Sequence, residues 1–266
     1  MHIYYWVMII FKIGDLVSRN SHNNDVLFRI VSINNDIAKL NGVNVRLEAD
    51  SELSDLVIGN DSENDKEIID RSIKDLTFDR ANYFYLPGKI LHIDGDDNYL
   101  DRSMKFYENI GIKANGLCLK EKDISLKIND LIKEYRPDIL VITGHDAYYK
   151  KKGNTDDINN YQNSINFVNA IKEVRKLEKN QDKLIIIAGA CQSDYEELIR
   201  AGANFASSPK RINIHALDPA IIASSIAFSD KNQSIDLIKL IEKTKYGSDG
   251  IGGIITNGTM YVGYPR

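Results

Sequence analysis

The pattern of apolar and polar positions divides the chain into two parts, and the longer, C-terminal part alternates strands with helices. Apolar runs over residues 89–93, 112–119, 138–143 and 183–188 have the length of buried strands and predict four of them. The segments between them predict helices over 100–111, 124–135 and 165–177. Strands joined by helices pair in parallel through right-handed crossovers. The pattern therefore predicts an α/β fold, an open parallel sheet with helices on both faces.

The N-terminal part is patterned differently. Short β-rich runs at 15–17, 26–32 and 37–40 are separated by Asn, Asp and Gly turn signals, which predicts a small, strongly bent, SH3-like β-barrel. A charged stretch with one short helix over 67–74 follows, up to Pro87-Gly88. We expect a barrel domain at 1–58, a charged linker at 59–85 and an α/β domain at 86–266.

The C-terminus has a hairpin pattern of its own. Residues 254–262 are β-rich, and Asn257-Gly258 in their middle suits a type I′ turn. We expect the two halves of this segment to pair with each other.

The composition excludes some classes of binding partner and cofactor. The 266 residues are 43% hydrophobic with a net charge of −4, which is typical of a globular protein without a basic field for nucleic acid or anionic membrane. Cys118 and Cys191 are the two cysteines, too few for a disulfide framework, and we expect Cys118 to be a buried strand residue. No spaced His, Cys and carboxylate cluster predicts a metal, and no cofactor is expected. The oligomeric state is left open.

The first eleven residues are apolar, but they lack a basic leader and a small-residue cleavage site and are too short to span a membrane. We therefore expect neither a signal peptide nor a membrane span. Translation from Met1 and from Met8 are both compatible with the sequence.

Two strands end in matching ways. Ile139-Leu-Val-Ile-Thr-Gly leads into His145, and Leu184-Ile-Ile-Ile-Ala-Gly-Ala leads into Cys191. Because parallel strands end at one edge of a sheet, the imidazole and the thiol are expected side by side, as a cysteine nucleophile and its base. Ser193 and Glu196 form a capping-box pattern and Gly202 a helix end, so Cys191 is expected just before a helix whose amides lower its pKa and bind an oxyanion.

Each residue also has a structural interpretation. A single cysteine after an apolar strand is commonly a small core residue, and a histidine there is commonly a turn residue. His215, after another short strand, competes with His145 for the role of base. The joint placement of His145 and Cys191 favours the catalytic interpretation.

The motifs carry a family resemblance. A histidine about 50 residues before the cysteine is the order of caspase-like proteases and the reverse of the papain order. Ile13-Gly-Asp-Leu-Val, Thr143-Gly-His-Asp146 and Ala188-Gly-Ala-Cys-Gln-Ser193 resemble the YabG family of sporulation-specific proteases, and the similarity runs from about residue 10 to the end.

This resemblance implies a caspase-like core and an endopeptidase of the mother-cell cytoplasm that associates with the forming spore coat. Its partners would be spore coat and germination proteins, cleaved at arginine-containing sites with Cys191 as nucleophile and His145 as base. The caspase-like pattern usually has Gly after the histidine, whereas here Gly144 precedes it and Asp146 follows. We expect the oxyanion to be held by amides of Gly144, Asp146 and Cys191.

Specificity for arginine needs an acidic pocket. In caspase-like folds the tip of the first strand lines this pocket, and here it carries Asp94, Asp96 and Asp97. We expect Asp94 first, because a carboxylate pairs bidentately with guanidinium. The alternative is that Asp96 and Asp97 cap the following helix.

A non-enzymatic alternative is a receiver-like signalling module. The acidic cluster at 94–97 and Ser208-Pro-Lys210 follow that layout, but Thr143 stands where the phosphoacceptor Asp is expected. The N-terminal barrel could dock protein partners or cover the protease, and both roles stay open.

Overall fold

The computed structural model describes residues 11–60, 65–74, 76 and 78–265. The expectations about a leader and about translation from Met1 or Met8 fall on residues 1–10 and lie outside the described residues. The chain divides into two compact units, one up to residue 63 and one from residue 64. Each unit is described by itself.

The N-terminal unit is an antiparallel sheet in the order β4-β3-β2-β1-β5. Its strands are β1 (Leu16–Arg19), β2 (Phe28–Asn34), β3 (Ile37–Gly42), β4 (Glu48–Glu52) and β5 (Leu56–Ile58), with 3-10 turns at Asn20–His22 and Leu53–Asp55. Alternate residues of the sheet, among them Val17, Phe28 and Leu40, form a small apolar core.

Over the described residues 11–60 the sheet is open, so the expected closed barrel is not found there. Closure needs β4 to pair with β5, but β5 has 3 residues and pairs with β1, and β4 reads Glu-Ala-Asp-Ser-Glu. A short strand and a charged strand are both poor partners for a further ladder.

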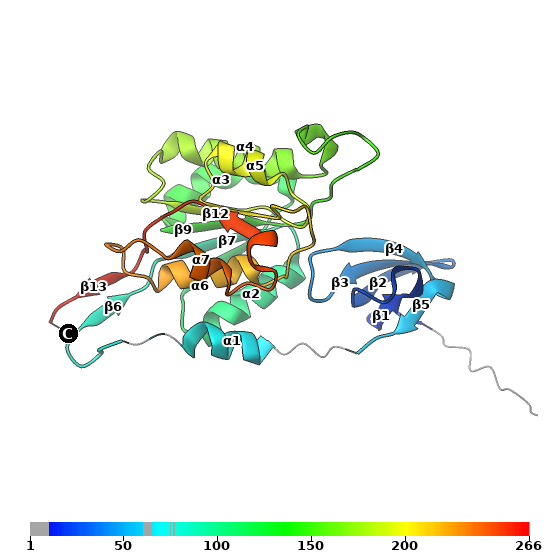
Figure 1. The fold of residues 1–266 in the computed structure, drawn as a ribbon, viewed down its shortest axis with the longest axis horizontal. Coiled ribbons are helices and arrows are strands. Elements are labelled where there is room, and N and C mark those ends of the chain that lie inside the picture. Colours follow the sequence, from blue (N-terminus) through cyan, green and yellow to red (C-terminus); the bar gives the residue numbers. More distant parts are fainter. Residues whose placement is uncertain (1–10, 61–64, 75, 77, 266) are drawn as a thin grey trace, which may run out of the picture. The chain divides into compact units, whose positions relative to one another are not determined.

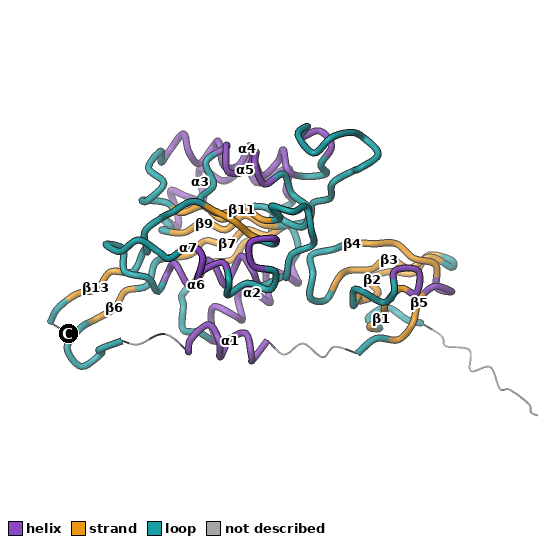
Figure 2. Tube along the Cα trace, in the orientation of Figure 1, coloured by secondary structure: helices purple, strands orange, loops and turns teal. Residues whose placement is uncertain are grey.

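The second unit is built on a six-stranded sheet in the order β12-β11-β10-β9-β7-β8. Figures 1 and 2 show this sheet between layers of helices. The strands are β7 (Ile90–Asp94), β8 (Ala114–Cys118), β9 (Ile139–Thr143), β10 (Ile185–Ala188), β11 (Phe205–Ser207) and β12 (Ile251–Gly253). All neighbours are parallel except β12, which runs antiparallel to β11. The α/β architecture and the four strands expected from the apolar runs are confirmed.

Helices cover both faces of this sheet (Figure 1). One face packs against α2 (Asp97–Asn109), α6 (Asp218–Ala227) and α7 (Leu237–Ile241). The other packs against α3 (Glu121–Tyr135), α4 (Ser164–Leu177) and α5 (Tyr195–Ala201). The central strands are apolar on both sides because both sides are buried. Short 3-10 turns lie at Ile158–Asn160 and Gly247–Asp249.

The short helix expected over 67–74 is confirmed. In α1 (Asp65–Lys74), Ile68 and Ile69 pack against the core beside α2, and Asp65 pairs with Arg102. Among the described residues, no helix has both the length and the apolar character needed to cross a bilayer.

The prediction of a C-terminal hairpin is wrong. β13 (Tyr261–Gly263) pairs with β6 (Phe84–Leu86), and β12 pairs with β11. Gly258 is needed for a close approach: an added Cβ would lie 2.0 Å from the backbone oxygen of Ser229. The glycine that suggested a turn thus lets two backbone segments touch.

Candidate active site

The ends of three neighbouring strands form the edge on which the predicted site lies. Asp94 of β7 pairs in register with Thr143 of β9, and Ile142 of β9 pairs with Ala188 of β10. Backbone bonds continue past the strand ends, from Gly95 N to Thr143 O at 3.0 Å and from Gly189 N to Ile142 O at 3.0 Å. The loops that carry residues 94–97, 144–146 and 189–191 therefore leave the sheet at one edge.

The backbone of His145 is fixed on both sides. Its N–H donates to Glu121 Oε1 at 2.8 Å, and its carbonyl accepts from Asn163 Nδ2 at 2.9 Å. Gly144 allows the first contact, because a Cβ there would lie 2.4 Å from Glu121 Oε1. This is a packing reason for glycine before the histidine.

The ring of His145 faces the start of α2. Nε2 lies 3.1 Å from Asp96 Oδ2, and the ring centroid lies 5.7 Å from that of Tyr99. Asp96 is also the N-cap of α2: its Oδ1 accepts from the amides of Asn98 at 2.8 Å and Tyr99 at 3.4 Å. One carboxylate thus contacts both the helix start and the imidazole.

Cys191 lies in the turn after β10 and is fully buried. Its Sγ lies 3.3 Å from the amide nitrogen of Ile214, which donates to it, and 3.9 Å from the carbonyl oxygen of the same residue. The next residue, Gln192, has a left-handed backbone (φ 57°) and donates its N–H to Ile212 O at 3.0 Å. The thiol is therefore held beside the segment that follows β11.

The two loops are tied to each other next to His145 and Cys191. Asp146 Oδ2 accepts from Ser193 Oγ at 2.8 Å and from Ser164 Oγ at 2.5 Å. Gln192 Oε1 accepts from the amide of Tyr148 at 3.3 Å. These bonds join the residues that follow His145 to those that follow Cys191.

Burial raises the pKa of Asp146, although four donors oppose the shift. Its Oδ1 accepts from the amides of Ala147 at 2.9 Å and Asn163 at 2.7 Å, in addition to the two serine hydroxyls on Oδ2. Its carboxylate is occupied inside the protein, so the part of Asp146 that remains a candidate for binding an oxyanion is its amide.

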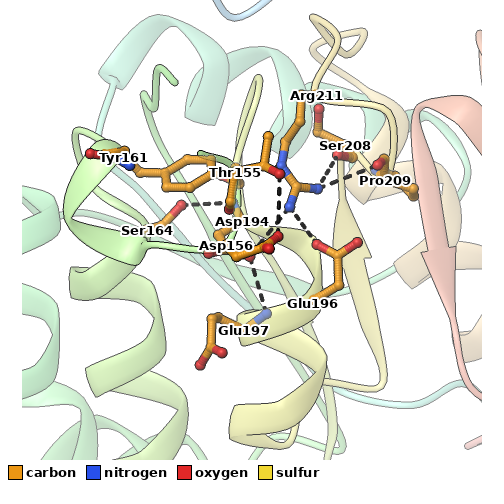
Figure 3. A network of polar contacts seen from close by, with 12 residues as sticks. Thr155, Asp156, Tyr161, Ser164, Asp194, Glu196, Glu197, Ser208, Pro209 and Arg211 are labelled. Atoms are coloured by element: carbon orange, nitrogen blue, oxygen red, sulfur yellow. Dashed lines mark hydrogen bonds and ion pairs between the residues drawn. The ribbon is translucent and has the colours of Figure 1, made fainter. Parts of the chain in front are cut away.

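Arg211 holds the segment after β11 to the start of α5, as Figure 3 shows. Its guanidinium donates to Tyr161 Oη at 2.6 Å, to Asp194 Oδ1 at 3.4 Å and to Glu196 Oε2. Ser164 links this network to Asp146, because its Oγ accepts from the amide of Asp194 at 2.8 Å. The chain beside Cys191 is thereby anchored by charge-assisted bonds.

The expected capping box at Ser193 and Glu196 is wrong. The cap of α5 is Asp194, which accepts from the amide of Glu197 at 3.3 Å. Ser193 Oγ instead donates to Asp146 and accepts from the amide of Ala190 at 2.9 Å. The end of the helix at Gly202 is confirmed, with φ +113°. Three residues separate Cys191 from α5 (Tyr195–Ala201), so the thiol does not lie just before the helix, where amides of the first turn were expected to contact it.

The three acidic candidates lie in different surroundings. Asp94 is fully buried and accepts from Thr143 Oγ1 at 2.8 Å and from the amide of Asp96 at 3.0 Å. Asp97, the first residue of α2, is exposed. The alternative that Asp96 caps this helix is confirmed.

Cys118 is exposed at the end of β8, and the expectation that it is buried is wrong. Partial burial of the thiol and the neighbouring Asp97 carboxylate raise the pKa of Cys118 to about 12. Cys118 is therefore a protonated thiol at neutral pH.

His215, the competitor for the role of base, is buried at the start of α6. Its Nδ1 accepts from the amide of Leu217 at 3.2 Å, and its own amide donates to Asp218 Oδ2 at 3.2 Å. A neutral ring that accepts at Nδ1 carries its proton on Nε2 and has no second lone pair for a thiol proton. This arrangement favours His145 over His215.

Several contributors gave no signal in the sequence. Glu121, Asn163, Ser164 and Tyr99 come from the starts of helices and reach the strand tips only after folding. Within the described part of the chain, no group of three or more His, Cys, Asp or Glu side chains is placed to hold a metal ion.

Comparisons with known proteins identify relatives over nearly the whole chain. The family model described as YabG peptidase U57 matches residues 12–76 and 61–265. The sporulation-specific protease YabG of Bacillus subtilis (strain 168) is 44% identical over 284 aligned positions, which cover 96% of this chain and 98% of that protein.

Proposed function

This chain belongs to the YabG family of sporulation-specific proteases, and from that premise we propose that it is a cysteine endopeptidase cleaving after arginine, with Cys191 as nucleophile and His145 as base. Family membership makes the chain a sporulation protease whose substrates are proteins. The receiver-like alternative without protease activity is thereby overturned.

The observation that carries the proposal is the pair of ties between the two strand-tip loops. Asp146 to Ser193 and Gln192 to Tyr148 join the neighbours of His145 to the neighbours of Cys191. A thiol–imidazole pair has to be held at a fixed separation to act as nucleophile and base. Two cross-links directly beside the two residues serve that purpose.

The proposed reaction is acyl transfer in two steps. His145 takes the thiol proton, and the Cys191 thiolate attacks the carbonyl carbon of the arginine, forming a C–S bond. The peptide C–N bond then breaks as the imidazolium of His145 gives its proton to the leaving amine. Water attacks the acyl-enzyme with His145 again as base, which releases the acid and restores the thiol. Amides of Gly144, Asp146 and Cys191 are the proposed donors to the oxyanion.

The tip of β7 is proposed to bind the arginine side chain. Of its three carboxylates, exposed Asp97 is best placed for a substrate guanidinium. Asp94 is fully buried and already accepts two hydrogen bonds, and Asp96 contacts His145. Asp97, in place of Asp94, is therefore the proposed partner of the arginine guanidinium. Spore coat and germination proteins in the mother cell are the proposed substrates.

Access to the thiol requires a movement. Cys191 is fully buried, and both backbone groups of Ile214 face its sulfur. A substrate carbonyl can reach Sγ only when the groups that cover it are displaced.

The test is cleavage of short fluorogenic peptides that end in Arg, Lys or Asp before the leaving group. Turnover should prefer Arg and should be lost in Cys191→Ala and in His145→Ala. Cys118→Ala is the matched control: its thiol lies beside Asp97 at the end of β8 and takes no part in the acyl transfer, so kcat should stay at the wild-type value. Turnover that persists in folded Cys191→Ala would refute the cysteine mechanism.

A further inference from the structure

The tautomer of a histidine is set by the hydrogen bond that one of its ring nitrogens makes, and the sequence did not indicate a partner for His145. The structure brings Asp96 to this position from the loop between β7 and α2. Its Oδ2 lies 3.1 Å from His145 Nε2, and the two side chains are largely shielded, each 12% exposed. Partly buried charge-assisted hydrogen bonds are stronger and better defined than those at the surface.

We propose that Asp96 is the positioning residue of the protease: it holds the proton of neutral His145 on Nε2, so that Nδ1 accepts the thiol proton of Cys191. This inference rests on the proposed Cys191–His145 function. An ionised carboxylate only accepts hydrogen bonds, so the nitrogen that faces it has to be the donor. In the neutral ring the other nitrogen is then the base.

The cap geometry makes this orientation rigid. Oδ1 of Asp96 is held by the amides of Asn98 and Tyr99 at the first turn of α2, which leaves Oδ2 directed at the imidazole. The Tyr99 ring lies against the same imidazole, with centroids 5.7 Å apart. The start of one helix therefore fixes both the direction and the plane of the ring.

The same contact has an electrostatic consequence. A carboxylate beside an imidazolium favours the charged ring, which is the form that protonates the leaving amine. Groups that face His145 are Asp96 and Tyr99 from the start of α2 and Glu121 from α3, whose carboxylate binds the backbone amide. Of these three groups, Asp96 places its carboxylate on the ring, at Nε2.

The experiment compares Asp96→Asn and Asp96→Ser with wild type and with Asp101→Asn in the full chain. Asn and Ser are both good N-caps, so α2 should keep its start. Asn removes the charge, and Ser is too short to reach the ring. Asp101 is an exposed residue of α2 that pairs with Lys105, so its substitution removes one charge from the same helix away from the site.

We expect kcat for the Arg peptide to fall about 10²-fold in both Asp96 variants, with KM and the Arg-to-Lys preference unchanged. In Asp96→Asn the alkaline limb of the kcat profile should move about one unit to lower pH, because the imidazolium loses its negative neighbour. Asp101→Asn should behave as wild type.

Two results would overturn the inference. An unchanged kcat and pH profile would show that the contact does not position the ring. A rise in KM confined to the Arg peptide, with kcat unchanged, would assign Asp96 to substrate binding. Failure of the Cys191–His145 proposal is recognised separately, by turnover that survives Cys191→Ala or His145→Ala.

Discussion

Replacing Asp146 by alanine removes one of the two ties between the strand-tip loops, the bond to Ser193. Three of its donors are Ser164 Oγ, Ser193 Oγ and the amide of Asn163, at 2.5, 2.8 and 2.7 Å. A buried donor left without an acceptor costs about 1–3 kcal/mol. The wild-type chain also bears the cost of keeping a buried carboxylate ionised, as the raised pKa of Asp146 shows. Alanine removes this cost, which offsets part of the loss in stability. We expect a net loss of about 3–5 kcal/mol in the free energy of unfolding.

The assay is urea unfolding of Asp146→Ala against wild type, followed by peptide cleavage below the transition. For a unit of this size the loss corresponds to a melting temperature lower by about 10 °C. Activity per folded molecule should fall about 10²-fold, because one of the two ties between the loops that carry His145 and Cys191 is lost and the bond from Tyr148 to Gln192 remains alone. The matched control is Asp156→Ala, an exposed residue of the loop between β9 and α4, which should change stability by less than about 0.5 kcal/mol. A stability loss in Asp146→Ala no larger than in this control would refute the reasoning.

The pH dependence of the same site gives a second check. The raised native pKa of Asp146 means that the folded chain holds this proton more tightly than the unfolded chain, whose value is about 3.9. The contribution of protonated Asp146 to the free energy of unfolding is therefore fully present below about pH 4, and it is lost as the pH rises through the native pKa. Measured against Asp146→Asn, which does not titrate, the relative stability of wild type should decline over that range. A relative stability that rises with pH would contradict the direction of the shift.

Three further substitutions test other parts of the site. Gly144→Ala should lower cleavage about tenfold, because its Cβ would displace the Glu121 carboxylate from the amide of His145, and normal activity at unchanged stability would contradict this. Asp97→Asn should raise KM for Arg peptides and leave kcat unchanged, and an unaltered Arg preference in steady-state assays would exclude Asp97 from the pocket. Arg211→Lys should destabilise the chain by about 1–3 kcal/mol in urea unfolding, because the planar fork to Tyr161, Asp194 and Glu196 is lost, and a variant as stable as wild type would show that the network is not needed.

The sheet could be predicted from the sequence because its strands are short, apolar on both sides and separated by helices with a clear apolar face. The β9 run 139–143 and the β10 run 185–188 needed only this local pattern. The same reasoning gave a wrong prediction for the C-terminal segment. A glycine such as Gly258 is typical both of a tight turn and of a close approach between two backbone segments, and the sequence does not distinguish the two.

Some residues of the candidate site could likewise be placed from the sequence, and others could not. His145 and Cys191 could be placed at one edge from strand order alone, since residues after parallel strands share an edge. The roles of Asp94, Asp96 and Asp97 could not be separated, because neighbouring identical residues differ only in burial and contacts after folding. Ser193 was misassigned because a serine three residues before a glutamate reads as a cap, whereas here its hydroxyl is used by Asp146.

The most direct test of the central claim is labelling by an arginine acyloxymethyl ketone, a probe that alkylates a thiolate once its side chain is bound. Intact-mass and peptide analysis of the full chain should place one label on Cys191 and none on Cys118, whose pKa of about 12 keeps it protonated. Labelling should be slower in His145→Ala and with the lysine probe, and absent with the aspartate probe. A chain that cleaves Arg peptides yet takes up no label on Cys191, or takes it up elsewhere, would contradict the account.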